Sequence, residues 1–528
     1  MAEKDAHGKE ILKDEKWQAM QMGDAAESPE TEDNYFEKVF TRLYGKMTWE
    51  EKLRLLWLSS TLFFIIGGYW LLRSIKDPII STINGVSAIP KAKMLSVAIM
   101  PFIVGIYNKL YDQFPSHQLF YIIGCFYMGL FTLIGFALMH PTIGIYNTNE
   151  DPTRFLGWVS YCSIESFGSI GVAQFWAFAN SVYDLESAKK SYGLMIACAQ
   201  VGSVMGPTLV TQAESLGIPV LFLCGAACMA MMVAMVFTYV QKFGASTTGQ
   251  EEDDDAASTD KKPAKKKKAG MLEGLKLIIQ HYYIQGITVI SCVFMVEVTI
   301  LDYAMKVLAK DKFTSIYPDD PVAATQAFAR FMGFFGQFAN GLTFLFSIVG
   351  TSFVIRRLGL PKTLVLFPSM LIVVCFVILA IPSLETVFVA MLLLKALSYA
   401  LNNPCKEMLY QPTNKAVKFK AKSWIDIFGQ RGAKALGSTV TFTFAESASA
   451  LLQNGMLISI GLSAGLVYVS NWMGKKFTEY TEEGYKVGDD KVPAAAQSSA
   501  EDTSCGLEEE GQADGTKTSK EKNKTVSV

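Results

Sequence analysis

The sequence predicts an all-α membrane protein of about twelve transmembrane helices, and three observations lead to this fold class. Hydrophobic residues make up 50% of the 528 residues, whereas charged residues make up only 18%. The apolar residues gather in runs such as Leu53–Leu72, Leu119–Met139 and Val220–Val240, and each run is long enough to cross ~30 Å of hydrocarbon as a helix. Charge is concentrated in the two termini and one central segment. These features exclude a soluble multidomain protein.

Each predicted span corresponds to one apolar window, with six windows before residue 243 and six after residue 272. The windows are Leu53–Leu72, Met94–Tyr111, Leu119–Met139, Phe155–Ser181, Ser191–Gln212, Ile218–Val240, Leu277–Leu301, Phe331–Ile355, Thr363–Ile381, Val387–Leu401, Ser423–Phe444 and Ala450–Trp472. The tenth and eleventh are the weakest, because Lys395 lies in one and Asp426, Arg431 and Lys434 lie in the other. A charged side chain costs at least ~2.5–3.5 kcal/mol at the bilayer centre, so these residues are candidates for function.

The charged segments divide the chain into five regions. We predict a disordered N-terminal tail at 1–48, a first six-helix half at 49–242, a charged linker at 243–272, a second six-helix half at 273–476 and a disordered C-terminal tail at 477–528. Most loop lysines and arginines lie on the side of the termini, which places both tails and the linker in the cytosol. The protein is therefore expected to be an integral, multi-pass membrane protein, with plastid, endoplasmic reticulum and plasma membrane all left open.

The two halves show signs of an internal repeat at an offset of about 230 residues. Lys189-Lys190-Ser191 before the fifth span parallels Lys420-Ala421-Lys422-Ser423 before the eleventh, and Gly206 pairs with Gly437. Repeated halves that hold a substrate near the membrane midplane are typical of secondary transporters. The alternative is that two unrelated helical bundles share short basic loops.

Enzyme motifs find little support in this chain. The string Gly432–Ser438 is the nearest approach to a phosphate-binding loop, but its lysine is misplaced and it lies in a predicted span. The four histidines lack metal-ligand spacing, and the nine cysteines lack the paired spacing of a disulfide framework. We expect no enzymatic activity, no cofactor, no metal site and no nucleic-acid partner.

Two pairs of cations are the main functional candidates. Arg431 and Lys434 lie three residues apart near the middle of the eleventh span, so they share one helical face. Arg73 and Lys76 repeat this spacing at the end of the first span. A guanidinium binds phosphate oxygens bidentately and an ammonium adds a compact charge. These pairs suit a polyanionic substrate, although structural ion pairing or snorkelling explains any single member equally well.

Acidic and aromatic residues complete the predicted site. Glu165 in the fourth span and Glu297 in the seventh are buried acids that can neutralise the cations when no substrate is bound. Trp176 and Asn180 offer an aromatic face and an amide that suit a purine, with helix packing as the alternative. Secondary candidates are Lys306, Lys395, Lys406 and Asp426.

Five motifs resemble those of the nucleotide transporter family, the ATP/ADP antiporters of plastids and intracellular bacterial parasites, over about Leu53–Phe477. They are Leu72–Asp77, similar to L-R-D-T-K-D; Glu165–Ser169, similar to E-L-W-G-S; Phe175–Asn180, similar to F-W-G-F-A-N; Val296–Val298, within N-L-V-E-V; and Pro404–Tyr410 with Ile425, Asp426, Arg431 and Lys434. The chain departs from the family pattern at Phe167, Ile300-Leu301, Ser398 and Asn403–Met408.

The resemblance implies a major-facilitator-like fold of two six-helix halves in a divergent eukaryotic, algal member. It also implies that the family's transport-related Lys and Glu residues fall on Lys76, Glu165, Glu297 and Lys434. We therefore expect a monomeric secondary transporter in the lipid bilayer that exchanges ATP for ADP by alternating access, with the nucleotide held between the halves.

Three alternatives remain at this point. If Glu165 or Glu297 titrates, the protein is instead a proton-coupled importer of a broader range of nucleotides. The second alternative is a carrier of another phosphorylated organic anion, and the third is a membrane receptor or scaffold that transports nothing.

Overall fold

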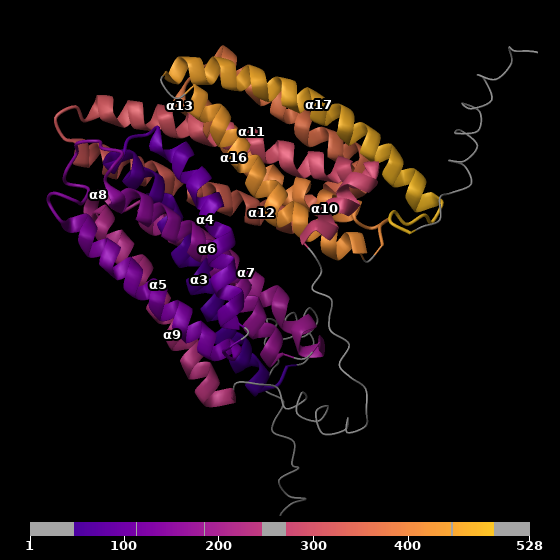
Figure 1. The fold of residues 1–528 in the computed structure, drawn as a ribbon, viewed down its shortest axis with the longest axis horizontal. Coiled ribbons are helices and arrows are strands. Elements are labelled where there is room, and N and C mark those ends of the chain that lie inside the picture. Colours follow the sequence, from indigo (N-terminus) through magenta and orange to yellow (C-terminus); the bar gives the residue numbers. More distant parts are fainter. Residues whose placement is uncertain are drawn as a thin grey trace, which may run out of the picture. The chain divides into compact units, whose positions relative to one another are not determined.

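The computed structural model describes residues 47–244 and 271–489, apart from 112, 184, 415, 445 and 446. This part of the chain is helical, with a single isolated bridge between Thr413 and Val487. The α-helices in chain order (Figure 1) are α3 (Trp49–Ile83), α4 (Ala88–Tyr111), α5 (Ser116–Met139), α6 (Phe155–Val182), α7 (Leu185–Val210), α8 (Ala213–Leu216), α9 (Ile218–Phe243), α10 (Met271–Gln280), α11 (Tyr282–Ile316), α12 (Pro321–Ala380), α13 (Leu384–Leu397), α14 (Asn403–Leu409), α15 (Lys422–Trp424), α16 (Gln430–Thr443) and α17 (Ala448–Glu482). Most of the predicted tails and linker lies outside the described residues.

Eleven of the twelve predicted windows lie in helices, to within a residue or two at their ends. The seventh window crosses a break at His281, between α10 and α11. By length and composition, eight helices of the described part are apolar enough to cross a membrane. Two predicted windows share α12, which is divided at Gly359, where φ is 74° and a residue without a side chain is favoured. The tenth and eleventh windows are interrupted by π-helical turns at Ser398–Asn402 and Ile425–Gly429. The all-α membrane fold class is confirmed.

Two helices extend beyond the windows that predicted them. The first window ends at Leu72 and the seventh at Leu301, but α3 continues to Ile83 and α11 to Ile316. Arg73, Lys76 and Lys306 therefore lie inside long helices, and the predicted position of Arg73 and Lys76 at a span end is wrong. A charge ends an apolar window without ending a helix, because the backbone hydrogen bonds continue through it.

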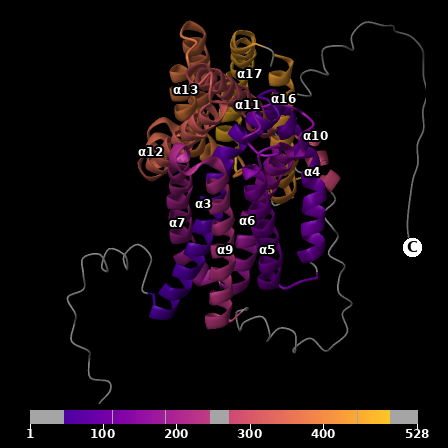
Figure 2. The same ribbon diagram turned by 90° about the vertical axis from the view of Figure 1, so that its left-hand side faces the viewer.

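The described helices form two compact units by their internal contacts. One unit contains α3 to α9 together with Ala309–Gly341, a segment that comprises the end of α11 and the start of α12. The other contains α10, the rest of α11 and α12, and the helices that follow. In the first unit α3 packs against α6, α7 and α9, and α5 packs against α6 and α9; Figure 2 shows α3, α5, α6, α7 and α9 running lengthwise beside one another.

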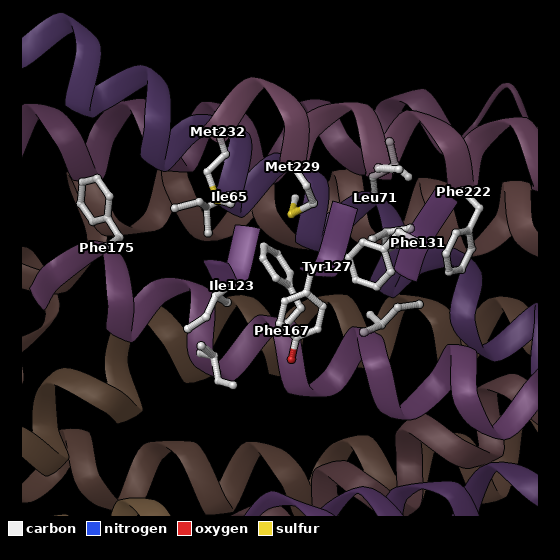
Figure 3. Packing of buried hydrophobic residues seen from close by; sticks show 14 of the residues in the cluster. Ile65, Leu71, Ile123, Tyr127, Phe131, Phe167, Phe175, Phe222, Met229 and Met232 are labelled. Atoms are coloured by element: carbon white, nitrogen blue, oxygen red, sulfur yellow. The ribbon is translucent and has the colours of Figure 1, made fainter. Parts of the chain in front are cut away.

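Aromatic rings fill the core of the first unit (Figure 3). Phe131 lies with ring centroids 5.8 Å from both Phe167 and Phe222, and Tyr127 lies 5.2 Å from Phe167. All three contacts are edge-to-face, which aromatic pairs prefer over a face-to-face sandwich. The Tyr127 hydroxyl donates to Ser166 Oγ at 2.8 Å, so its polar end is paired within the core. These contacts fix α5 against both α6 and α9.

Glycines allow close approach of the first and fifth spans in each half. A Cβ at Gly206 on α7 would lie 2.2 Å from the Gly67 carbonyl oxygen on α3, and one at Gly437 on α16 would lie 2.9 Å from the Val296 carbonyl oxygen on α11. Small residues at such crossings let helix backbones touch in membranes. The two glycines that the repeat pairs therefore occupy corresponding helix crossings.

The segment Ala309–Gly341 is tied to the first unit by polar contacts. Thr325 Oγ1 lies 2.7 Å from Thr82 Oγ1 on α3, and Asn340 Nδ2 donates to the Ser203 carbonyl at 2.7 Å on α7. Arg330 also forms an ion pair with Glu214 on α8. These bonds explain why the segment clusters with α3 to α9 rather than with the rest of α11 and α12.

The loop between α5 and α6 is organised around one guanidinium. Arg154 donates to the carbonyl oxygens of Ile143, Gly144, Asn147 and Asn149, at 2.6 to 3.0 Å. Next to it, Thr153 donates to Asp151 Oδ1 at 2.8 Å from both its backbone N–H and its hydroxyl. These hydrogen bonds hold the pKa of the Asp151 carboxyl below its ordinary value. The loop thereby holds the start of α6 in place.

The second unit has its own core of aliphatic and aromatic side chains. Ile284 and Ile287 of α11 pack in it with Leu409 of α14 and Met473 of α17. The Tyr283 hydroxyl donates to the Leu409 carbonyl at 2.9 Å. These contacts anchor α11, α14 and α17 within this unit.

Candidate functional site

The first unit brings three predicted site residues together. Lys76 Nζ lies 3.2 Å from Glu165 Oε1, and Arg73 Nη1 lies 3.6 Å from the same oxygen. One carboxylate from α6 therefore bridges both cations of α3. This contact is the one expected if Glu165 neutralises the two cations when no substrate is bound. Lys76 is 3% exposed, whereas Arg73 and Glu165 are about one-third exposed. The cluster thus has a buried end and an accessible end.

Side chains one turn away complete this cluster. Lys76 Nζ lies 3.8 Å from the ring centroid of Tyr161, and the Arg73 guanidinium donates to the Tyr69 hydroxyl at 2.7 Å. Asp77 Oδ1 lies 3.3 Å from Lys76 Nζ. Because two carboxylates face two cations, the four ionised groups sum to zero. The sequence analysis did not select Tyr69 or Tyr161. Tyr69 lies four residues before Arg73 and Tyr161 four residues before Glu165, and this one-turn spacing could have indicated that each lies beside a site residue.

A second charge cluster lies in the second unit. Asp302 Oδ2 is 2.5 Å from Lys306 Nζ one turn along α11, and Asp302 Oδ1 is 4.0 Å from Lys395 Nζ on α13. The sequence identified both lysines as secondary candidates, but it did not identify Asp302, the acid that joins them. Asp302 lies one turn before Lys306, and that spacing was a signal for it.

Glu297 stands apart from these clusters. It is fully buried on α11, and its Oε1 accepts from the Ser463 hydroxyl of α17 at 2.7 Å. Its Oε2 has no hydrogen-bond partner within the described part of the chain. The helix packing thus turns Glu297 toward a serine, and its neutralising role stays a prediction.

The cations of the eleventh span lie on α16. Arg431 is half-buried and Lys434 is exposed, and the π-helical turn Ile425–Gly429 immediately precedes them. Asp426 in that turn accepts from Gln430 Nε2 at 2.9 Å. Turns of this type widen a helix locally and are frequent at functional sites.

Lys406 lies in α14, just after another π-helical turn, and is almost fully buried. Its neighbour Glu407 accepts from Lys422 Nζ at 2.5 Å, and Lys422 also lies 5.6 Å from the ring centroid of Tyr410. At least one lysine of the basic loop that follows the tenth span, Lys422, therefore makes contacts within the second unit.

The aromatic string on α6 divides into core and accessible residues. Phe175 and Phe178 are fully buried core residues, whereas Trp176 is half-buried and Asn180 is exposed. Tyr192 of α7 joins the accessible pair: its ring lies 4.9 Å from Trp176 in an edge-to-face contact, and its hydroxyl donates to Asn180 Oδ1 at 2.5 Å. The sequence did not identify Tyr192, because it comes from another helix.

A cleft of about 690 Å³ lies away from all of these residues. Pro361 and Lys362 of α12 and Gly474 and Lys475 of α17 line it, and none of the predicted site residues does. Among the described residues, no group of three or more His, Cys, Asp or Glu side chains is placed to hold a metal ion.

The helical fold and its membrane-embedded charge clusters define the class of polytopic membrane transporters. Solved transporter structures share the fold. The nucleoside transporter NupG (D323A mutant) aligns with a TM-score of 0.54 at 15% identity, over 80% of this chain and 99% of NupG. A bacterial homologue of the human lysosomal transporter Spinster aligns with a TM-score of 0.52 at 13% identity, over 82% of this chain and 99% of that protein.

The chain belongs to the TLC ATP/ADP transporter family, whose sequence pattern matches residues 30–477. It is 24% identical to ADP,ATP carrier protein 1, chloroplastic, of Arabidopsis thaliana, over 85% of this chain and 79% of that carrier. It is 23% identical to ADP,ATP carrier protein 1 of Rickettsia bellii, over 78% of this chain and 89% of the relative. The predicted family and the predicted class of multi-pass nucleotide transporter are confirmed.

Proposed function

We propose that this protein exchanges ATP for ADP across a membrane by alternating access, acting as a monomer. The observation that carries the proposal is the shared carboxylate of the first unit, where Glu165 Oε1 lies within 3.6 Å of both Arg73 and Lys76. Two cations held by one accessible acid form a site that a phosphate group can enter, because its oxygens take over the bonds that Glu165 makes.

Charge balance provides the physical basis for exchange. When a phosphate replaces Glu165 as the partner of Arg73 and Lys76, its negative charge neutralises both cations. The protein can then change between inward-facing and outward-facing states without exposing unneutralised charge to the membrane. Without a bound anion, Glu165 holds the two helices α3 and α6 together. A substrate that binds one state better than the other shifts the equilibrium between them. Export of one nucleotide is thereby coupled to import of another.

The remaining candidates take supporting roles in this proposal. Arg431 and Lys434 on α16 add positive charge for the other phosphates. The base packs against Trp176 and Tyr192, whose rings meet at a centroid distance of 4.9 Å, and Asn180 contributes an exposed amide. An aromatic surface with a polar edge suits a purine.

Uptake of labelled ADP into proteoliposomes tests the proposal. Vesicles preloaded with unlabelled ATP should take up the label much faster than empty vesicles, because exchange needs a counter-substrate. Phosphorylated sugars and unphosphorylated nucleosides serve as competitors, and the proposal expects neither to compete as well as ATP. Absence of nucleotide uptake under any condition would refute the proposed function.

Variants of α16 test the site within the same assay. Lys434→Ala should reduce exchange far more than Lys265→Ala, since Lys434 lies on α16 in the predicted eleventh span and Lys265 lies in the predicted charged linker. Both substitutions remove one positive charge, so the linker variant is a matched control. Equal effects of the two substitutions would remove Lys434 from the site.

Proton-coupled uptake is the second candidate function, and the environment of Glu297 favours it. A buried acid with one oxygen on Ser463, and with no hydrogen-bond partner for the other among the residues that the structure describes, is a group that can bind and release a proton during transport. In this case, uptake into empty vesicles would respond to an imposed proton gradient. Glu297→Gln would abolish that response, whereas Ser463→Ala would weaken it.

A further inference from the structure

The cluster of Asp302, Lys306 and Lys395 has a counterpart in the other half of the chain. Lys306 lies 230 residues after Lys76, and Lys395 lies 230 residues after Glu165. This spacing is the offset at which the two halves correspond. The first and fourth predicted spans of each half, α3 with α6 and α11 with α13, therefore each carry one charge cluster.

The two clusters use the same arrangement with the charges exchanged between helices. In the first, both cations lie on α3 and the bridging acid comes from α6. In the second, the acid Asp302 and the cation Lys306 lie on α11, and α13 supplies the other cation, Lys395. In both, one carboxylate contacts two cations, although in the first cluster Asp77 also contacts Lys76. This recurrence at repeat-related positions argues for a shared role.

Burial and charge show what the second cluster can bind. The side chains of Asp302, Lys306 and Lys395 are 14%, 4% and 13% exposed. The two lysines and one acid leave a formal excess of one positive charge among these three groups. Asp302 directs a different oxygen to each lysine, at 2.5 and 4.0 Å. Two oxygens of one phosphate group can reproduce this bridging pattern.

We propose that Lys306 and Lys395 form a second phosphate-binding site and that Asp302 is the internal anion that the incoming phosphate displaces. The proposal rests on the proposed nucleotide exchange and assigns a specific role to an acid of the second half. A phosphate group carries up to about two negative charges against one for Asp302. Displacement therefore leaves the lysines more fully neutralised than before.

Substitutions of Asp302 and of the two lysines should have opposite effects on anion binding, and this contrast tests the site. We would measure the dissociation constants of ADP and of inorganic pyrophosphate for the purified full-length protein and its variants. Asp302→Asn should tighten binding of both anions several-fold, because it removes the competing carboxylate. Lys306→Gln and Lys395→Gln should each weaken binding by about tenfold or more. Asp311→Asn and Lys312→Gln are matched controls at exposed positions on α11 and should leave both constants unchanged.

A purely structural ion pair gives a different pattern. It predicts that Asp302→Asn and Lys306→Gln both lower the unfolding temperature and that neither changes the dissociation constants, and this result would overturn the proposal. If Asp302→Asn does not fold, the paired variant Asp302→Asn with Lys306→Gln avoids an unmatched lysine on α11. In that background a further Lys395→Gln change must weaken pyrophosphate binding by about tenfold, and no change would equally overturn the proposal.

Failure of this inference and failure of the proposed function are distinguishable. Pyrophosphate carries no base, so its binding tests the second phosphate site without requiring transport. Lysine-dependent pyrophosphate binding without ATP/ADP exchange would remove the proposed function and leave the site. Normal exchange with unchanged anion binding in all three variants would remove the site and leave the function.

Discussion

At the residue scale, the chemistry of this protein depends on acids placed between cations. Glu165 contacts both Arg73 and Lys76, so removal of Glu165 takes one ion-pair contact from each cation. The cost depends on burial. Lys76 is 3% exposed, and a buried charge without its partner is strongly destabilising. Arg73 keeps its contact with Tyr69 when the acid is lost.

We predict that Lys76→Gln lowers the rate of ADP exchange by at least about tenfold, because a charged hydrogen bond to phosphate is lost. The measurement is initial uptake into ATP-loaded proteoliposomes, normalised to the amount of folded protein. Lys109→Gln, at an exposed position near the end of α4, is the control. Exchange in Lys76→Gln at the control rate would contradict the assignment of Lys76.

Base recognition provides a second prediction at this scale. Trp176→Ala should raise the ADP concentration needed for half-maximal exchange, whereas pyrophosphate binding stays unchanged, because only the base contacts the ring in our proposal. Trp176→Phe should retain much of the affinity. Phe178→Leu, a change in the buried core, controls for general loss of packing. A parallel loss of ADP and pyrophosphate affinity would instead indicate a role in the fold.

At the element scale, close helix crossings hold the functional helices in position. A Cβ at Gly206 would meet backbone atoms of Gly67 and Leu71, which no side-chain movement can relieve. The same applies in the second half, where Gly437 meets the Val296 carbonyl. The helices that bear Arg73, Lys76 and Lys306 therefore each pack closely against a neighbouring helix through a glycine.

Gly206→Ala should lower the unfolding temperature of the purified protein or prevent its folding, at a cost of about 1–3 kcal/mol for the forced separation of α3 and α7. Gly129→Ala on α5 is the matched control, because a Cβ there meets nothing within 4 Å. Thermal unfolding in detergent provides the measurement. Equal unfolding temperatures for the two variants would contradict the close crossing.

At the scale of the whole molecule, alternating access requires segments to separate and rejoin. The segment Ala309–Gly341 follows the first part of α11 in the chain but packs with α3 to α9. Thr325 and Thr82 meet across this contact with their hydroxyl oxygens 2.7 Å apart. If the transport cycle opens this contact, a covalent link across it stops the cycle in one state.

A variant with cysteine at both Thr82 and Thr325 should lose exchange on mild oxidation and recover it on reduction. The single-cysteine variants, treated in the same way, control for oxidation of the native thiols. Mass spectrometry would verify the cross-link. Full exchange by a cross-linked protein would show that the contact between Thr82 and Thr325 persists throughout transport.

From the sequence alone, apolar runs predicted twelve helical windows. The cost of placing a charge in the bilayer singled out the charged residues within them. These signals are local, since an apolar run and a helical spacing are properties of neighbouring residues. The structure alone decided which charges meet. Asp302 joins Lys306 to Lys395, Tyr192 joins Trp176 and Asn180, and Glu297 faces Ser463 rather than a cation. Asp302 with Lys395 and Glu297 with Ser463 are contacts between helices far apart in the chain, which no local pattern encodes.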